Sequence, residues 1–365
     1  MTAPALQILA GPAARARLAQ RGLRADDVGL IPAAAGGPKG LILNGLDRHI
    51  FGDWLPQSRQ PVHLVGASIG AWRMATAALA HRDVADAFNT MAEAYVTQEY
   101  DVLPGEKRPR PEGVSRRFGE ILAEIFEGRE ADVLAHPRYR LHVVTSRGQN
   151  KGLGLLAREG RLRTPLGYLG AFAANAMSRP LLGRFLERVV FSDPRDRLPL
   201  RLNDFTTREV HLSRANLRGA LLASCSIPFW LRAQHDLPGA PRGAYWDGGI
   251  TDYHLHLDYR ELQASGAPLV LYPHFQRQVV PGWLDKALKH RHRSTAFLDN
   301  VVLLCPSPGW IATLPGAKLP DRNDFMALDA DERRRRWRVA VGESQRLADE
   351  FAALAQRDSI PALPL

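Results

Sequence analysis

The pentapeptide GASIG at residues 66–70 decides how the rest of the chain is interpreted. It follows PVHLV at 61–65, an apolar run typical of a buried strand, and precedes AWRMATAALA at 71–80, which is typical of a helix. A strand, a tight turn with serine at its apex and then a helix form the context that a nucleophile elbow requires. Gly66 and Gly70 would let the backbone turn sharply. The stretch therefore predicts an exposed, reactive Ser68 at the N-terminus of a helix.

A second glycine-rich stretch, GGPKG at 36–40, follows another predicted strand about 30 residues upstream of Ser68. Acyl transfer creates an oxyanion that preorganised donors must stabilise, and the N–H groups of Gly36 and Gly37 could supply them. Lys39 either adds positive charge there or is simply solvated. The stretch matches neither the phosphate loop G-x-x-x-x-G-K-[ST] nor the dinucleotide fingerprint G-x-G-x-x-G.

A third stretch, DGG at 247–249, ends a predicted strand. A serine is a poor nucleophile unless a base activates it. Asp247 could accept the Ser68 proton, either directly or through water. The alternative is an aspartate that only hydrogen-bonds the backbone of its own turn, as is common in D-G sequences. Both interpretations stay open on the residues alone.

Together these three stretches resemble the patatin-like phospholipase family. The family pattern is a glycine-rich oxyanion loop after the first strand, then G-x-S-x-G, then D-G-G or D-G-A. ASCSIPF at 223–229 is similar to the A-S-x-x-I-P-x-x-F stretch that usually precedes D-G-G in this family. Order and spacing agree over about residues 28–260, whereas 100–205 and 310–365 carry no family motif.

The resemblance implies a three-layer α/β/α fold with a mostly parallel central sheet, and hydrolysis of acyl esters in phospholipids or neutral lipids. It also implies a Ser-Asp dyad without a catalytic histidine. The sequence shows no calcium loop and no His/Cys cluster, so no metal or cofactor is expected. Carried over, Ser68 is the nucleophile, Asp247 the general base, and Gly36 and Gly37 the oxyanion donors. The remaining matched positions have structural roles, at the elbow (Gly66, Gly70) or in support (Lys39, Gly40, Gly248, Gly249).

The chain departs from the family pattern at two places. Ala35 stands where the loop usually has its first glycine, and ITDYH at 250–254 replaces a stretch that usually includes Asn and Pro. The second change puts the local turn in doubt. Histidines near it sustain an alternative within the hydrolases, a Ser-Asp-His triad of Ser68, Asp247 and either His274 or His254.

Short apolar runs alternate with helical patterns along the chain, which predicts an α/β fold. The predicted strands lie at 28–35, 61–65, 141–146, 269–272 and 300–305, with a weaker one at 210–212. We expect a hydrolase domain over 1–310 and a C-terminal helical extension over 311–365, including one helix from 329 to about 355. Residues 100–205 are expected to be a helical insertion or cap, of which 150–205 would lie over the site.

The chain has 365 residues, a net charge of +10 and only two cysteines. The sequence shows no secretory signal and no apolar run long enough to span a membrane, so a cytoplasmic protein is expected. The charge is either spread over an arginine-rich surface or attracts polyanions. The basic cluster at 286–293 is expected to be a solvated helix face, and no nucleic-acid motif accompanies it. The four arginines at 333–336 occupy one helical turn and point in all directions, so they form a poor flat patch, although Trp337 beside them could favour an interface.

Two functions from different classes follow. The first is a lipid acyl hydrolase that acts on phospholipids or other lipid esters and contacts the inner membrane face peripherally. The second is a non-catalytic patatin-fold protein that binds an anionic lipid or polymer surface. No nucleic-acid partner is expected for either.

Overall fold

The structure is a computed structural model, and it describes residues 4–79, 83–102, 104–106, 108–149 and 154–365. Its centre is a sheet that has 11 strands within these residues. The main strand order is β11-β1-β10-β9-β2-β3-β4-β5-β6, and β8 pairs with both β4 and β7. The strands are β1 (Leu6–Ala10), β2 (Val28–Ala33), β3 (Val62–Ala67), β4 (Tyr139–Gly148), β5 (Leu186–Ser192), β6 (Thr207–His211), β7 (Gln234–His235), β8 (Ala244–Asp247), β9 (Leu269–Pro273), β10 (Val301–Pro306) and β11 (Leu363–Pro364).

The middle of the sheet is parallel, from β10 through β9, β2 and β3 to β4. Antiparallel pairing occurs at β1–β10, β4–β5 and β4–β8. Every residue of β2 and β9 is buried, because a parallel sheet is covered on both faces and its strands are therefore continuous apolar runs. The predicted α/β fold with a mostly parallel sheet is confirmed.

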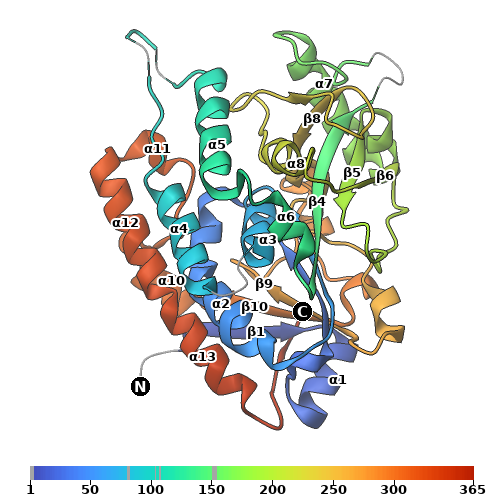
Figure 1. Cartoon of the computed structure of the whole chain (residues 1–365), viewed down its shortest axis with the longest axis vertical. Coiled ribbons are helices and arrows are strands. Elements are labelled where there is room, and N and C mark those ends of the chain that lie inside the picture. Colours follow the sequence, from blue (N-terminus) through green and yellow to red (C-terminus); the bar gives the residue numbers. More distant parts are fainter. Residues whose placement is uncertain (1–3, 80–82, 103, 107, 150–153) are drawn as a thin grey trace.

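Helices cover the two faces of this sheet (Figure 1). Helix α3, which follows the elbow, is buried along its whole length, and its residues are apolar nearly all round, as expected for a helix enclosed by other elements. The helices are α1 (Pro12–Arg21), α2 (Asn44–His49), α3 (Ile69–Leu79), α4 (Val84–Val96), α5 (Pro111–Phe126), α6 (Glu130–Ala135), α7 (Arg163–Met177), α8 (Leu217–Ser224), α9 (Gly249–Asp252), α10 (Pro308–Thr313), α11 (Asp324–Ala327), α12 (Ala330–Glu343) and α13 (Gln345–Ala355).

The single helix expected from 329 to about 355 is wrong, because two helices meet at Ser344. The Ser344 hydroxyl accepts a hydrogen bond from the N–H of Gly45 at 2.9 Å and donates to the carbonyl of Val341 at 2.6 Å. These contacts dock α12 and α13 beside α2, along one side of the molecule (Figure 1). The last strand, β11, pairs with β1.

The range 100–205 contains helices α5, α6 and α7, and two strands of the central sheet, β4 and β5, lie between or after them. The boundaries of an insertion or cap, and those of a C-terminal extension, stay a prediction. None of the described helices combines the length and the apolar character needed to cross a bilayer.

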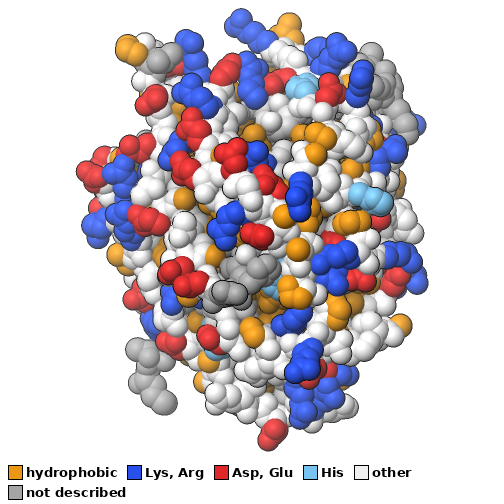
Figure 2. All heavy atoms as spheres, viewed as in Figure 1, with side chains coloured by type: hydrophobic (Ala, Val, Ile, Leu, Met, Phe, Trp, Pro, Cys, Tyr) orange, Lys and Arg blue, Asp and Glu red, His pale blue; other side chains and the backbone are white. Residues whose placement is uncertain are grey.

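The charged side chains are intermixed on the face shown in Figure 2, where lysines and arginines alternate with acidic residues. The basic cluster at 286–293 is not a helix face but a loop with one 3₁₀ turn at Lys289–Arg291, although Lys289, His290 and Arg293 are exposed as expected. The arginines at 333–336 lie around one turn of α12 and differ in exposure, since Arg335 is exposed. Arg333 is 3% exposed and donates to the carbonyl of Gln98 at 2.6 Å. Arg291 donates to Asp285 at 3.0 Å and to the carbonyl of Asn175 at 2.8 Å, so this stretch is a loop docked on α7.

Candidate active site

Ser68 stands alone between β3 and α3 and has a φ of 55°. A positive φ is uncommon for a residue other than glycine, and it marks a strained backbone. The turn is tight on both sides. A Cβ on Gly66 would lie 2.4 Å from the Ala71 Cα, and one on Gly70 would lie 1.9 Å from the Ala33 carbonyl oxygen. Only glycine fits at either position, so the sequence around Ser68 enforces its sharp geometry.

The Ser68 hydroxyl donates a hydrogen bond to Asp247 Oδ2 at 2.8 Å. The sheet brings the two together, because β3 and β8, which ends at Asp247, pair one after the other with the same side of β4, whose opposite side pairs with β5. The second carboxylate oxygen, Oδ1, accepts the N–H of Gly249 at 2.7 Å. Both side chains are 5% exposed. The expectation of an exposed serine is therefore wrong, because other elements cover the elbow.

Burial raises the pKa of Asp247 to about 6, against the opposing effect of its hydrogen bonds from Ser68 and the Gly249 N–H. A carboxylate with a pKa near neutrality is suited to accept a proton and to return it.

Ser224, at the end of α8, holds the elbow in place. Its hydroxyl accepts the backbone N–H of Ser68 at 2.8 Å and donates to the Val144 carbonyl at 2.7 Å. Two residues further along the chain, the Ser226 carbonyl accepts a hydrogen bond from the N–H of Asp247 at 3.0 Å. The role of Ser224 was not predicted from the sequence, although ASCSIPF is similar to a family motif. The available signal was the position of this stretch shortly before D-G-G.

The glycine loop lies against the D-G-G turn. A Cβ on Gly249 would lie 2.6 Å from the Ala35 Cβ, and the Ala35 N–H donates to the Tyr253 carbonyl at 2.9 Å. Gly37 has a φ of 57°, and a Cβ on Gly36 would lie 2.5 Å from the Phe275 ring. The N–H groups of Gly36 and Gly37 donate to no acceptor among the residues that the structure describes.

The geometry agrees with a comparison of the sequence with family models. The model of patatin-like phospholipases matches residues 35–254, which is 220 of the 365 residues. The chain belongs to the patatin-like phospholipase family. Membership implies lipid acyl hydrolase activity. A comparison with curated proteins gives no match.

The other supporting glycines of this patatin-like chain also occupy crowded positions. A Cβ on Gly248 would lie 2.0 Å from the Val144 carbonyl oxygen, and one on Gly40 would lie 3.2 Å from the Ile69 side chain. Gly248 therefore lets β8 end directly against β4, whereas Gly40 lets the glycine loop approach the start of α3.

Three cations surround the glycine loop. The Lys39 ammonium lies 5.6 Å from the centre of the Phe275 ring, and the Lys286 ammonium lies 4.1 Å from the centre of the Tyr253 ring. Arg322 Nη2 lies 3.7 Å from the position that a Cβ on Gly37 would take. None of the three forms an ion pair with any acidic group that the structure describes. Lys286 and Arg322 lie outside the patatin-like match, and sequence reasoning gave them no place at the site.

The histidines of the triad alternative hold backbone groups instead of the dyad. His254 Nδ1 accepts the N–H of Val280 at 3.0 Å, and His274 Nδ1 accepts the N–H of Gln276 at 3.0 Å. Burial lowers the pKa of His274 to about 3. Neither ring hydrogen-bonds to Ser68 or Asp247, which contradicts the Ser-Asp-His triad.

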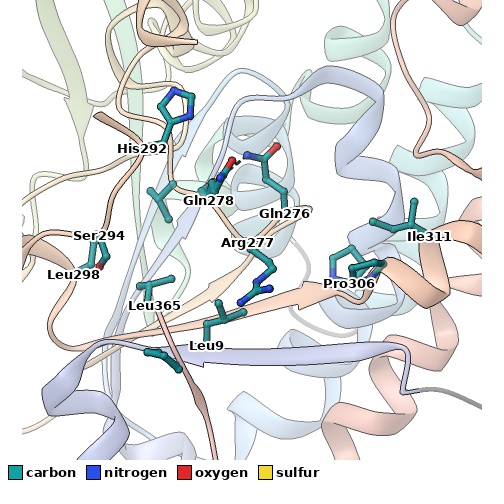
Figure 3. Close-up of a pocket in the computed structure, with 13 residues that line it drawn as sticks. Leu9, Gln276, Arg277, Gln278, His292, Ser294, Leu298, Pro306, Ile311 and Leu365 are labelled. Atoms are coloured by element: carbon teal, nitrogen blue, oxygen red, sulfur yellow. Dashed lines mark hydrogen bonds between the residues drawn. The ribbon is translucent and has the colours of Figure 1, made fainter. Parts of the chain in front are cut away.

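A cavity of about 540 Å³ lies away from the dyad, at the edge of the sheet (Figure 3). Leu9 of β1, Leu365 at the C-terminus and Arg277 line it, together with neighbouring loop residues. Neither Ser68 nor Asp247 belongs to its lining. In the part of the chain that the structure describes, no group of three or more His, Cys, Asp or Glu side chains is placed to hold a metal ion.

Proposed function

We propose that this protein hydrolyses acyl ester bonds of phospholipids or other lipid esters through a dyad of Ser68 and Asp247. The observation that carries the proposal is the 2.8 Å hydrogen bond from the Ser68 hydroxyl to Asp247 Oδ2 at a strained elbow. The free N–H groups of the neighbouring glycine loop, and the family to which the chain belongs, support the same chemistry.

The reaction begins when the Ser68 oxygen attacks the ester carbonyl carbon while Asp247 takes the hydroxyl proton. The N–H groups of Gly36 and Gly37 donate to the oxyanion of the tetrahedral intermediate. Asp247 returns its proton to the leaving alcohol, and an acyl group remains on Ser68. Water then attacks the acyl carbonyl, Asp247 again takes and returns the proton, and the fatty acid leaves as the Ser68 hydroxyl reforms.

Ser224 is the positioning residue of this scheme. Its hydroxyl bonds the Ser68 backbone on one side and β4 on the other, which fixes the elbow relative to the strand that pairs with β8. The proton therefore has a short and defined path between the Ser68 hydroxyl and Asp247.

A non-catalytic protein that binds an anionic lipid or polymer surface is the second candidate. The three cations at the glycine loop favour it, because Lys39, Lys286 and Arg322 form no ion pair with the acidic residues that the structure describes. The low exposure of Ser68 is also compatible with this candidate. Under it, vesicle binding would be strong and salt-dependent, and Ser68 would not react.

The test compares wild type with Ser68→Ala on p-nitrophenyl acyl esters of several chain lengths. We expect the variant to lose activity by roughly 10⁴-fold or more, as serine hydrolases do without their nucleophile. Ser294→Ala, at an exposed serine, is the matched control and should retain full activity. Equal rates for wild type and Ser68→Ala, with no fluorophosphonate label on Ser68, would favour the non-catalytic candidate.

A further inference from the structure

Helix α7 presents a continuous apolar surface to solvent. Leu162, just before the helix, is 75% exposed, Leu166 56%, Leu169 66%, Phe172 38% and Met177 80%. These five side chains are called the α7 face from here on. The first four recur at intervals of three or four residues, Met177 ends the helix, and no charged residue interrupts them between 164 and 178. A water-facing helix that is apolar along one face is typical of a surface that contacts another molecule or a lipid.

The α7 face lies above the strand that carries Asp247. On the inner side of the helix, the Tyr168 ring packs edge-on against Trp246, with ring centroids 5.8 Å apart. Trp246 is the neighbour of Asp247 in β8, which lies beside α7 in Figure 1. Tyr168 also packs against Phe229, which is 58% exposed and follows the turn that holds Ser68. The thickness of one helix, about 10 Å, thus separates the α7 face from the dyad strand.

Cations border the same surface. Arg163 is exposed at the first turn of α7. Near the other end of the helix, Asn175 donates to Asp285 at 2.9 Å and so holds a loop against α7. That loop carries Trp283, which is 45% exposed, and Lys286, whose ammonium lies 5.9 Å from the centre of the Trp283 ring. Exposed aromatic and aliphatic groups with a basic border match the chemistry of an anionic lipid surface.

We propose that the α7 face inserts into the surface of a lipid aggregate with anionic head groups and thereby brings lipid esters to the dyad. The choice of lipid esters as cargo rests on the proposed function, whereas the binding step itself needs no catalysis. Leu166 and Leu169 enter the acyl boundary, and Arg163 and Lys286 meet the head-group phosphates. A second copy of this chain is the competing occupant, and the experiment separates the two.

Binding is measured by co-sedimentation with phosphatidylcholine vesicles that do or do not contain phosphatidylglycerol. The parent protein is Ser68→Ala, so that the vesicles are not hydrolysed. Adding Leu166→Gln and Leu169→Gln should weaken binding to the anionic vesicles by roughly tenfold or more, because two inserting side chains become polar. Met326→Gln, on α11, changes an apolar side chain that is 51% exposed outside the α7 face, and it should bind like the parent.

Hydrolysis by proteins that retain Ser68 separates this inference from the proposed function. Leu166→Gln/Leu169→Gln should lose activity on vesicles but retain wild-type activity on a short-chain, water-soluble p-nitrophenyl ester. If wild type hydrolyses neither substrate, the proposed function fails, and the sedimentation result still decides whether the α7 face binds lipid. Equal vesicle binding by the double variant and its parent would overturn the inference. A wild-type dimer that the double variant turns into a monomer, with vesicle binding unchanged, would also overturn it.

Discussion

Asp247 and Asp252 lie at the two ends of the turn that contains α9, five residues apart, and both are buried, with 5% and 0% of their surface exposed. Their partners differ. Within the described residues, Asp247 accepts hydrogen bonds only from the Ser68 hydroxyl and the Gly249 N–H. Asp252 accepts the Nε and Nη2 of Arg188 at 2.7 and 2.6 Å, and Arg179 at 3.2 Å.

The difference teaches what a buried carboxylate needs in order to move a proton. Two arginines pair with Asp252 inside the protein, and removing one member of such a buried pair leaves an uncompensated charge. The same arginines contact Asp204, and Arg188 holds the pKa of that carboxyl well below its usual range. No arginine in the described part of the chain forms an ion pair with Asp247, and burial raises its pKa to about 6. Asp252 is therefore part of a buried ion-pair network, whereas Asp247 is placed to exchange a proton with Ser68.

Asp247 should show the largest effect, because it is the carboxylate proposed to accept the Ser68 proton. Asp247→Asn should lower kcat by about 10²–10⁴-fold, because an amide cannot take the Ser68 proton. The fold should remain, since asparagine keeps an oxygen for the Gly249 N–H. The measurement is kcat on a soluble ester together with the thermal melting temperature. A variant with wild-type kcat would remove Asp247 from the mechanism, and one that fails to fold would show that its role is structural, like that of Asp252.

Asp252→Asn should show the opposite pattern. Replacing this carboxylate leaves Asp204 as the one described acidic partner of the Arg188 guanidinium, so we expect the free energy of unfolding to fall by about 3 kcal/mol. Urea unfolding gives that number, and kcat per folded molecule should change little. If stability holds and kcat collapses instead, then Asp252 takes part in the chemistry and the contrast between the two aspartates is wrong.

Glycines explain why so much of the candidate site was predictable from the sequence. A Cβ would collide with nearby atoms at four glycines of the site, Gly66, Gly70, Gly248 and Gly249. Glycine at these fixed positions is therefore required by the geometry of the site and can be recognised in the sequence. The parallel strands were predictable for a similar reason, because burial on both faces requires apolar runs. The family match and the sheet confirm the fold class.

Long-range partners carry no such local signal. Arg188 and Asp252 are 64 positions apart, and nothing in the sequence distinguishes them from exposed charged residues. In the structure they form a buried ion pair. Strand β5, which contains Arg188 and Glu187, is fully buried in the sheet but is not a continuous apolar run. Lys286 and Arg322 reach the glycine loop only because the C-terminal half of the chain packs back on the sheet. Local sequence patterns predict which residues are buried and where the chain turns, whereas these contacts depend on the tertiary structure.

The smallest effect concerns the charges around Asp247. Because its pKa is about 6 and the reaction needs the ionised carboxylate, kcat/KM on a soluble ester should rise with pH through about 6 and then level off. The field of Arg322 favours the ionised form and so lowers this pKa. Arg322→Gln should therefore move the acidic limb of the profile to higher pH.

The size and the salt dependence of that shift make the test specific. Arg322 is partly exposed and does not hydrogen-bond to Asp247, so the shift should be less than about one pH unit, and salt should reduce the difference between variant and wild type. Arg116→Gln, at an exposed arginine of α5, is the matched control and should leave the limb in place. If Arg322→Gln leaves the limb unchanged or moves it to lower pH, Asp247 is not the group whose ionisation sets the rate. The titrating base would then have to be sought elsewhere.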